Sequence, residues 1–367
     1  MLRMLKGSGP WRAVRMRGVR AATWRAGAIA GATLGALAVA SCERAPGGSG
    51  GAMRVERVIG SVGTWPGQFA TPRAIDTDGS TLWVVDKTAR VQRIDPMTGD
   101  PLSEFKTPRH AQGMPVGLTC ATLGGRPVLI IPDTHEHRVL IYEIPEETAR
   151  VPELVAEFGV YGEGPGRFIY PTDVEVVTDP AFGTRLYVGE YGGTDRVSVF
   201  NDRFEFLFSF GQFGSGSDPS GVEFNRPQAI EFDPLRRELV IADACNHRIG
   251  RFTLDGELVA WIGSPESAGT EPGRFMYPYG LAVLDDGSAL VVEFQNGRVQ
   301  RIDLGTGEPL ETFGKRGRGE GQLVSPWAVC LIDRTAYVVD GGNNRVLAFR
   351  SPRPAPASGV ASAGGGR

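Results

Sequence analysis

The chain has 367 residues and a formal net charge of −3, from 39 basic and 42 acidic side chains. Its 51 glycines and 26 prolines are about a fifth of the residues. Both residue types interrupt helices, which argues against a mainly helical protein, and the glycines follow no three-residue period, which excludes a collagen-like triple helix.

Residues 1–41 predict an export signal. Seven basic and no acidic residues lie within 1–25, and an apolar run of small residues follows at 26–40. As a helix, this run would span roughly 22 Å, which is short for a bilayer core about 30 Å thick. The segment Val39-Ala40-Ser41-Cys42 resembles a bacterial lipobox, which implies lipidation of Cys42. A plain signal peptide or a short N-terminal anchor, with an incidental Cys42, is the alternative.

The chain after the signal is distinctly acidic. Without the seven basic residues of 1–41, the net charge becomes −10, which disfavours nucleic acid as a partner. Residues 42–53 and 351–367 are rich in small residues and proline, and predict a flexible tether and a disordered tail. We therefore expect an exported protein, held by its lipid at the periplasmic or outer-membrane face, with one domain at 54–350.

Six repeats fill residues 54–350. Each begins with Pro and a small, apolar stretch, continues with an apolar run that ends in an acid, and then has a turn, an Arg and a final apolar stretch. Repeats of about 50 residues with four short strands are typical of propeller blades. The acid and Arg of each repeat are Asp86 and Arg90, Asp133 and Arg138, Glu190 and Arg196, Asp243 and Arg248, Glu293 and Arg298, and Asp340 and Arg345.

The sixth repeat ends near residue 350 without its fourth strand, and a spare strand pattern lies at 55–59. The sequence thus predicts an all-β protein, a six-bladed β-propeller of four-stranded blades. The N-terminal strand is expected to complete blade six and close the ring.

Several segments resemble the NHL-repeat family. They are GQFATP (67–72), GRFIYP (166–171), GRFMYP (273–278), DACNHR (243–248) and DGGNNR (340–345). The resemblance covers nearly all of the chain after the predicted signal and tether. It implies a six-bladed propeller and says much less about function, because this fold hosts many activities.

The acid and Arg that recur in every repeat predict a structural ion pair within each blade. A ligand site is better sought where the repeats differ, at the residue after each Pro, which should lie near the axis. These residues are Arg73, Val116, Thr172, Gln228, Tyr279 and Trp327. They suit a shaped binding face, although drift at tolerant loop positions is the alternative.

Asp173 stands where the other five repeats have Ala or Gly. An acid near a tight axis is costly unless it is paired, hydrated or metal-bound. Asp173 could line a water-filled channel, help to bind a cation, or be a hydrogen-bonded structural acid.

Basic and aromatic residues gather in the loops of contiguous blades. Trp65, Arg316 and Arg318 join Arg73, Tyr279 and Trp327 in blades five, six and one. Such an arc predicts binding of an anionic peptide, glycan or small molecule, and ordinary solvated loops are the alternative.

His110, His135 and His137 are weak candidates for a loop metal site. His137 shares its repeat position with His247, which indicates a shared local role. The amidating lyases have this propeller and hold zinc with histidines near the axis, but the innermost-strand motifs here contain none, so that resemblance stops at the fold. We predict no cofactor, with a pore or loop metal left open.

The sequence predicts a binding or interaction scaffold for a protein, peptide or glycan on the loop face. No nucleophile-elbow or phosphate-loop motif is present, and a non-enzymatic role is favoured. One alternative is a hydrolase or lyase with a pore metal near Asp173. Another is a structural component of a cell-envelope assembly.

Overall fold

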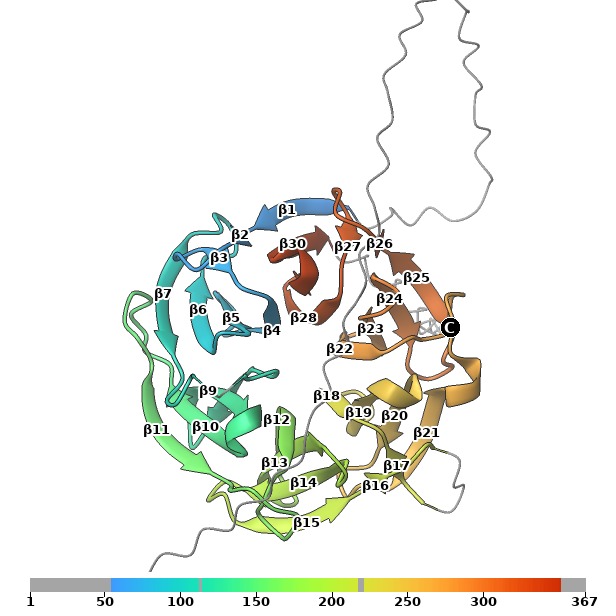
Figure 1. Cartoon of the computed structure of the whole chain (residues 1–367). Helices are drawn as coiled ribbons and strands as arrows, with labels where there is room; N and C mark the ends of the chain where they lie inside the picture. The colour runs from blue at the N-terminus through green and yellow to red at the C-terminus, as the bar shows by residue number, and fades with distance from the viewer. Residues whose placement is uncertain (1–53, 112–113, 217–220, 351–367) are drawn as a thin grey trace, which may run out of the picture. The chain divides into compact units, whose positions relative to one another are not determined.

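The computed structural model describes residues 54–111, 114–216 and 221–350, which form a ring of sheets around a central axis (Figure 1). The predicted signal, Cys42, the tether and the tail lie outside these residues. Among the described residues, no helix is long and apolar enough to cross a membrane.

Six four-stranded antiparallel sheets make up the blades, as predicted. Blade one is β4 (Pro72–Thr77), β5 (Leu82–Asp86), β6 (Arg90–Ile94) and β7 (Pro101–Lys106); blade two is β8 (Thr119–Leu123), β9 (Arg126–Asp133), β10 (Arg138–Glu143) and β11 (Glu153–Phe158); blade three is β12 (Tyr170–Asp179), β13 (Gly183–Tyr191), β14 (Arg196–Asn201) and β15 (Phe206–Phe210). Blade four is β18 (Pro227–Asp233), β19 (Glu238–Asp243), β20 (Arg248–Phe252) and β21 (Leu258–Gly263); blade five is β22 (Pro278–Val283), β23 (Ser288–Glu293), β24 (Arg298–Asp303) and β25 (Pro309–Phe313); blade six is β28 (Pro326–Ile332), β29 (Thr335–Asp340), β30 (Arg345–Arg350) and β1 (Val55–Ile59).

Short elements lie between the blades. The two-residue strands form parallel ladders, β2 (Ser61–Val62) with β3 (Gln68–Phe69), β16 (Gln212–Phe213) with β17 (Glu223–Phe224), and β26 (Lys315–Arg316) with β27 (Gln322–Leu323). Single 3₁₀ turns are η1 (Thr134–Glu136), η2 (Ala244–Asn246), η3 (Pro265–Ser267) and η4 (Gly341–Asn343).

The N-terminal strand closes the ring as predicted. β1 pairs antiparallel with β30, from Val55 opposite Phe349 to Ile59 opposite Val346. The first and last parts of the domain therefore share one sheet, so that blade six is completed by residues some 290 positions away in sequence.

The core lies between neighbouring blades. Ile59 and Val346 of blade six pack in one buried cluster with Ile75 and Leu82 of blade one, and Phe69 lies fully buried among them. Middle strands such as β5 are buried along their whole length, which explains their nearly continuous apolar sequence. The outer strand β25 alternates instead between more and less exposed positions, as expected for a sheet edge with one solvated face.

Blade two departs from the repeat. Its inner strand was expected to begin near Pro115, as in the other blades, but β8 begins only at Thr119, which pairs with Ile130. Continuing that register would place Gly117 opposite Pro132 of β9. Because proline has no N–H to donate, the ladder cannot extend past this point.

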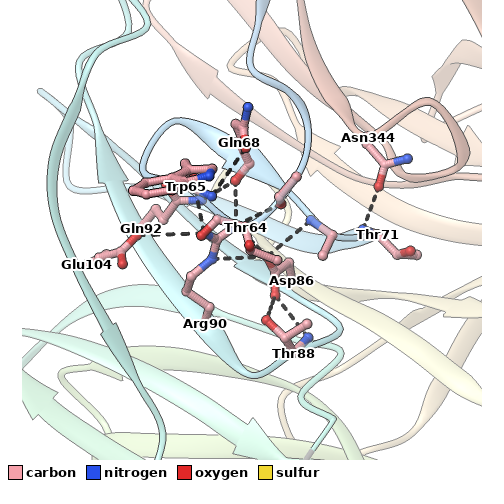
Figure 2. Close-up of polar contacts among 12 residues, drawn as sticks. Thr64, Trp65, Gln68, Thr71, Asp86, Thr88, Arg90, Gln92, Glu104 and Asn344 are labelled. Atoms are coloured by element: carbon pink, nitrogen blue, oxygen red, sulfur yellow. Dashed lines mark hydrogen bonds and ion pairs between the residues drawn. The ribbon is translucent and has the colours of Figure 1, made fainter.

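Side chains next to the recurring turns connect consecutive blades. Asn344 Oδ1 of blade six accepts the Thr71 N–H of blade one at 2.7 Å (Figure 2). At the same repeat position, Asp195 Oδ1 accepts the Arg226 N–H at 2.7 Å and His247 Nδ1 accepts the Tyr277 N–H at 3.1 Å. Asn344 has φ of 56°, a left-handed conformation that Asn tolerates better than most residues.

Replacing Asn344 with Ala should lower the free energy of unfolding by about 1–2 kcal/mol, because it removes the bond to Thr71 and places Ala in a left-handed conformation. Asn344→Gly is the matched control, since it keeps the backbone unstrained and removes only the bond. Urea unfolding should rank the wild type above Asn344→Gly, and Asn344→Gly above Asn344→Ala. Equal midpoints for all three would show that this bond does not stabilise the ring.

Candidate functional site

The six acid and Arg pairs are structural, as predicted. Each Arg pairs with the acid of its own blade, at nitrogen–oxygen distances of 2.5–3.0 Å. In blade one, Arg90 pairs with Asp86 and also donates to the carbonyl oxygens of Thr64 and Gln68 (Figure 2). These arginines therefore hold the loops that precede the inner strands and are not available to a ligand.

The inner strands of all six blades enclose an axial cavity of about 500 Å³. Its wall includes six residues that the sequence singled out, Arg73, Val116, Asp173, Gln228, Tyr279 and Trp327. They come from six different blades, so the ring brings together residues that lie far apart in sequence.

At one end of this cavity, which we call the mouth, the wall residues Arg73, Tyr279 and Trp327 meet Arg226 and Tyr191, which stand next to the wall. The Arg73 guanidinium lies over the Trp327 ring at 5.1 Å, and the Arg226 guanidinium lies over Tyr191 at 4.7 Å and Tyr279 at 5.0 Å. The Tyr279 and Trp327 rings are 4.9 Å apart. The mouth is thus a rigid wall of π surfaces with two cations packed against it.

The two guanidinium groups have no acidic partner among the residues that the structure describes. Within the described ranges, neither Arg73 nor Arg226 forms an ion pair, and Arg73 Nε has no hydrogen-bond partner. Arg226 Nε donates to Gln228 Oε1 at 2.7 Å. Burial lowers the pKa of Arg73, and the charge of Arg226 lowers it further. An anion placed between them would relieve this repulsion and satisfy open donors.

Three further acids line the cavity, and sequence reasoning missed them. Asp76, Glu175 and Glu231 each lie four residues after the Pro of their inner strand and join Asp173 in the wall. Comparing the six repeats at this position would have found them, because the other three have Thr119, Ala282 and Cys330.

The wall acids accept backbone N–H groups from the next blade. Asp76 Oδ2 accepts the Cys120 N–H at 2.7 Å, and Asp173 Oδ2 accepts the Ile230 N–H at 2.9 Å. Burial raises the pKa of both Asp76 and Asp173 to about 7. Asp173 is therefore a hydrogen-bonded acid in the channel wall, and its hydrogen bond joins blade three to blade four.

Repulsion between acids acts on the deeper part of the wall. Burial raises the pKa of Glu175 well above its usual value, and the charges of Asp173 and Asp76 raise it further. Burial and the charge of Glu175 do the same to the pKa of Glu231. The cavity thus has two cations at its mouth and carboxyl groups that retain protons near neutral pH in its wall.

This arrangement makes stability depend on pH. The folded protein holds protons on Asp76 and Asp173 up to a pH near 7, whereas an unfolded chain releases them near pH 4. These acids therefore lower the free energy of unfolding as the pH rises from 5 to 8, by about 2–3 kcal/mol for each acid relative to the variant Asp76→Asn/Asp173→Asn.

The difference between wild type and variant is the quantity to measure. Burial lowers the pKa values of His135 and His247. These histidines therefore raise the free energy of unfolding as the pH rises, which opposes the effect of the acids equally in the wild type and the variant. Urea unfolding at pH 5 and pH 8 should show a smaller loss in the double variant, which keeps Glu175 and Glu231 with their raised pKa values. Identical pH profiles would contradict the assignment of buried, protonated acids.

The other candidate residues lie elsewhere. Thr172 is buried, and its Oγ1 donates to the Pro227 carbonyl at 2.6 Å, so it joins blades three and four. Trp65, Arg316 and Arg318 are exposed and are not part of the cavity wall. The predicted arc is therefore divided into two groups of residues. Arg73, Tyr279 and Trp327 lie at the cavity mouth, whereas the other three lie near the β2–β3 and β26–β27 ladders.

The histidines do not form a metal site in the part of the chain that the structure describes, where no three metal-ligating side chains are placed to hold an ion. His137 Nδ1 donates to the Ile169 carbonyl of blade three, which matches the inter-blade role of His247. His135 lies against the Tyr170 ring, and His110 is exposed. Among these described residues, no such group lies around Asp173 either.

Comparisons with known proteins support the propeller. No family model matches the chain. Peptidyl-glycine alpha-amidating monooxygenase B of Xenopus laevis is 33% identical over 99 residues, which are 26% of this chain and 11% of that protein. Protein lin-41 of Caenorhabditis elegans is 48% identical over 42 residues, 11% of this chain and 4% of that protein. The chain thus covers a small part of the curated relatives it matches.

Solved structures give the same result at low identity. A protein from Bacteroides thetaiotaomicron has a TM-score of 0.58 at 16% identity, covering 82% of this chain and 76% of that chain. A streptogramin B lyase has a TM-score of 0.54 at 13% identity, covering 82% and 98%. At such identities the likeness concerns the fold alone.

Proposed function

We propose that this chain is a ligand-binding propeller of the NHL type that takes an anionic group at the mouth of its axial cavity. The observation that carries the proposal is the convergence of Arg73 and Arg226 on that mouth without an acidic partner in the described ranges. A guanidinium pair of this kind fits a carboxylate or phosphate in a bidentate manner.

The ligand class follows from the walls around the two arginines. Tyr279 and Trp327 offer flat apolar surface beside the cations, which suits an acidic peptide side chain, a peptide C-terminus or an acidic sugar. The protonated wall acids below can donate hydrogen bonds to the same ligand without repelling it. The chain then acts as a scaffold for a protein, peptide or glycan, as the residues that differ between the repeats suggested.

The location is part of the proposal. The basic and apolar leader with its lipobox-like Cys42 supports an exported protein that is anchored by lipid and faces the cell envelope. A lyase or hydrolase with a pore metal is less well supported, because the described acids and histidines are not arranged as a group of three ligands.

The test is capture of ligands from detergent-solubilised cell envelope by the full-length protein, with metal analysis of the same preparation. The proposal expects an anionic peptide, protein or glycan that is retained at low salt and released at high salt, without turnover. Stoichiometric metal together with chemical conversion of the captured molecule would support the enzyme instead.

A further inference from the structure

A second surface lies at the two ends of β1. It consists of Val62 and Trp65 near the β2–β3 ladder and Lys315, Arg316 and Arg318 near the β26–β27 ladder, and we call it the rim patch. Both ladders flank β1 (Figure 1). They are equivalent in the repeat, since Val62 and Arg316 are each the second residue after a closing glycine and pair in the same parallel register.

The rim patch combines exposed apolar and basic side chains. Trp65 is 75% exposed and Val62 is 71% exposed. The three basic residues are also exposed, and none of them forms an ion pair with another described residue. They outnumber the one exposed acid of the same loop, Glu320. An exposed Trp beside unpaired Lys and Arg is typical of surfaces that meet the headgroup region of a bilayer.

The same repeat position differs in the opposite half of the ring. Tyr161 is also exposed there, at 64%, but its loop carries one exposed acid, Glu163, and one exposed base, Arg167, which donates to the Tyr161 carbonyl. The loop at Tyr161 therefore has no excess of basic side chains, unlike the loop that carries Lys315, Arg316 and Arg318.

The chain enters the domain beside this patch. Val55 begins β1, and its Cγ2 would lie 3.6 Å from a Cβ placed on Gly321, in the loop between β26 and β27. Cys42 precedes Arg54 by twelve residues, which can span at most about 43 Å. If Cys42 carries a lipid, Arg54 is kept within this distance of the bilayer, and the β26–β27 side of the rim patch lies next to it.

We propose that the rim patch docks on an anionic lipid surface and orients the ring at the membrane. The proposal rests on the predicted lipid anchor but is independent of the ligand at the cavity mouth. Each basic side chain close to such a surface raises partitioning by about fivefold, so the three together contribute on the order of a hundredfold. Trp65 and Val62 add apolar contact at the headgroup level.

The test places the full-length protein in vesicles whose acyl chains carry bromine, which quenches nearby Trp fluorescence. Vesicles of phosphatidylcholine with phosphatidylglycerol are compared with vesicles of phosphatidylcholine alone, and Trp65→Phe identifies the Trp65 signal. We expect quenching of Trp65 in the anionic vesicles, its loss in Lys315→Glu/Arg316→Glu/Arg318→Glu, and its reduction by high salt.

Arg203→Glu/Arg334→Glu is the matched control, because both residues are exposed and lie in turns at the opposite ends of the strands. It should keep the quenching of the wild type. The proposal is overturned if Trp65 is not quenched in anionic vesicles, if it is quenched equally in neutral ones, or if the triple variant behaves like the control.

Discussion

Replacing Arg248 with Ala should lower the free energy of unfolding by about 3–5 kcal/mol, because it leaves a buried carboxylate without its cation. Arg248 Nε pairs with Asp243 Oδ2 at 2.8 Å, and both side chains are almost fully buried. Its Nη2 donates to the Glu223 carbonyl at 2.7 Å, and the guanidinium covers the Trp261 ring at 3.5 Å. Urea unfolding of the variant measures the loss.

Two further variants separate the buried charge from other causes. Arg126→Ala removes an exposed pair with Glu143 and should cost less than about 0.5 kcal/mol. Asp243→Asn/Arg248→Met removes both charges and should cost less than Arg248→Met alone. If Arg248→Ala were no more harmful than Arg126→Ala, the repeated pair would not hold the blades together.

Removing the charges at the cavity mouth should abolish ligand capture. Arg73→Gln/Arg226→Gln is expected to weaken binding of the ligand recovered from the envelope by at least about a hundredfold, because hydrogen bonds to charged groups contribute roughly 1.5–3 kcal/mol each. Equilibrium binding at low and high salt measures the change, and the thermal unfolding of the variant shows whether the fold is intact.

The rim patch provides the matched control for this experiment. Arg316→Gln/Arg318→Gln removes two exposed charges outside the cavity wall and should change the affinity by less than about threefold. Equal losses in the two double variants would mean that general charge, rather than the geometry of the mouth, attracts the ligand.

The fold could be predicted because the same local sequence pattern recurs six times. A single apolar run is ambiguous, but six runs that each end in an acid and are followed by Arg define the strands, and the missing fourth strand of the last repeat identified β1 as the strand that closes the ring. Blade two shows the limit, because one proline in β9 shortens the inner strand locally.

The site could be predicted only in part. Arg73, Gln228, Tyr279 and Trp327 were identified by comparing the position after each Pro. Arg226 stands one residue before that Pro, where the other repeats have Thr71, Met114, Tyr170, Tyr277 and Ser325, and this position was not compared.

The sequence repeats do not show how far each loop lies from the axis of the ring, and the predicted arc was wrong in this respect. Trp65, Arg316 and Arg318 belong to blades next to those of Arg73 and Trp327, yet adjacency in the ring does not say how far from the axis a side chain lies. The structure places them at the ladders beside β1 instead of in the cavity wall.

The most direct test of an anion site at the mouth is nuclear magnetic resonance of the arginine side chains during titration with a probe carboxylate, sodium benzoate. Arg73→Lys and Arg226→Lys assign the two Nε–H signals. The structure predicts that both signals move together and saturate, and that each single variant weakens the response of the other. Unchanged Arg73 and Arg226 signals, or shifts that grow without saturation and include exposed arginines such as Arg316, would contradict it.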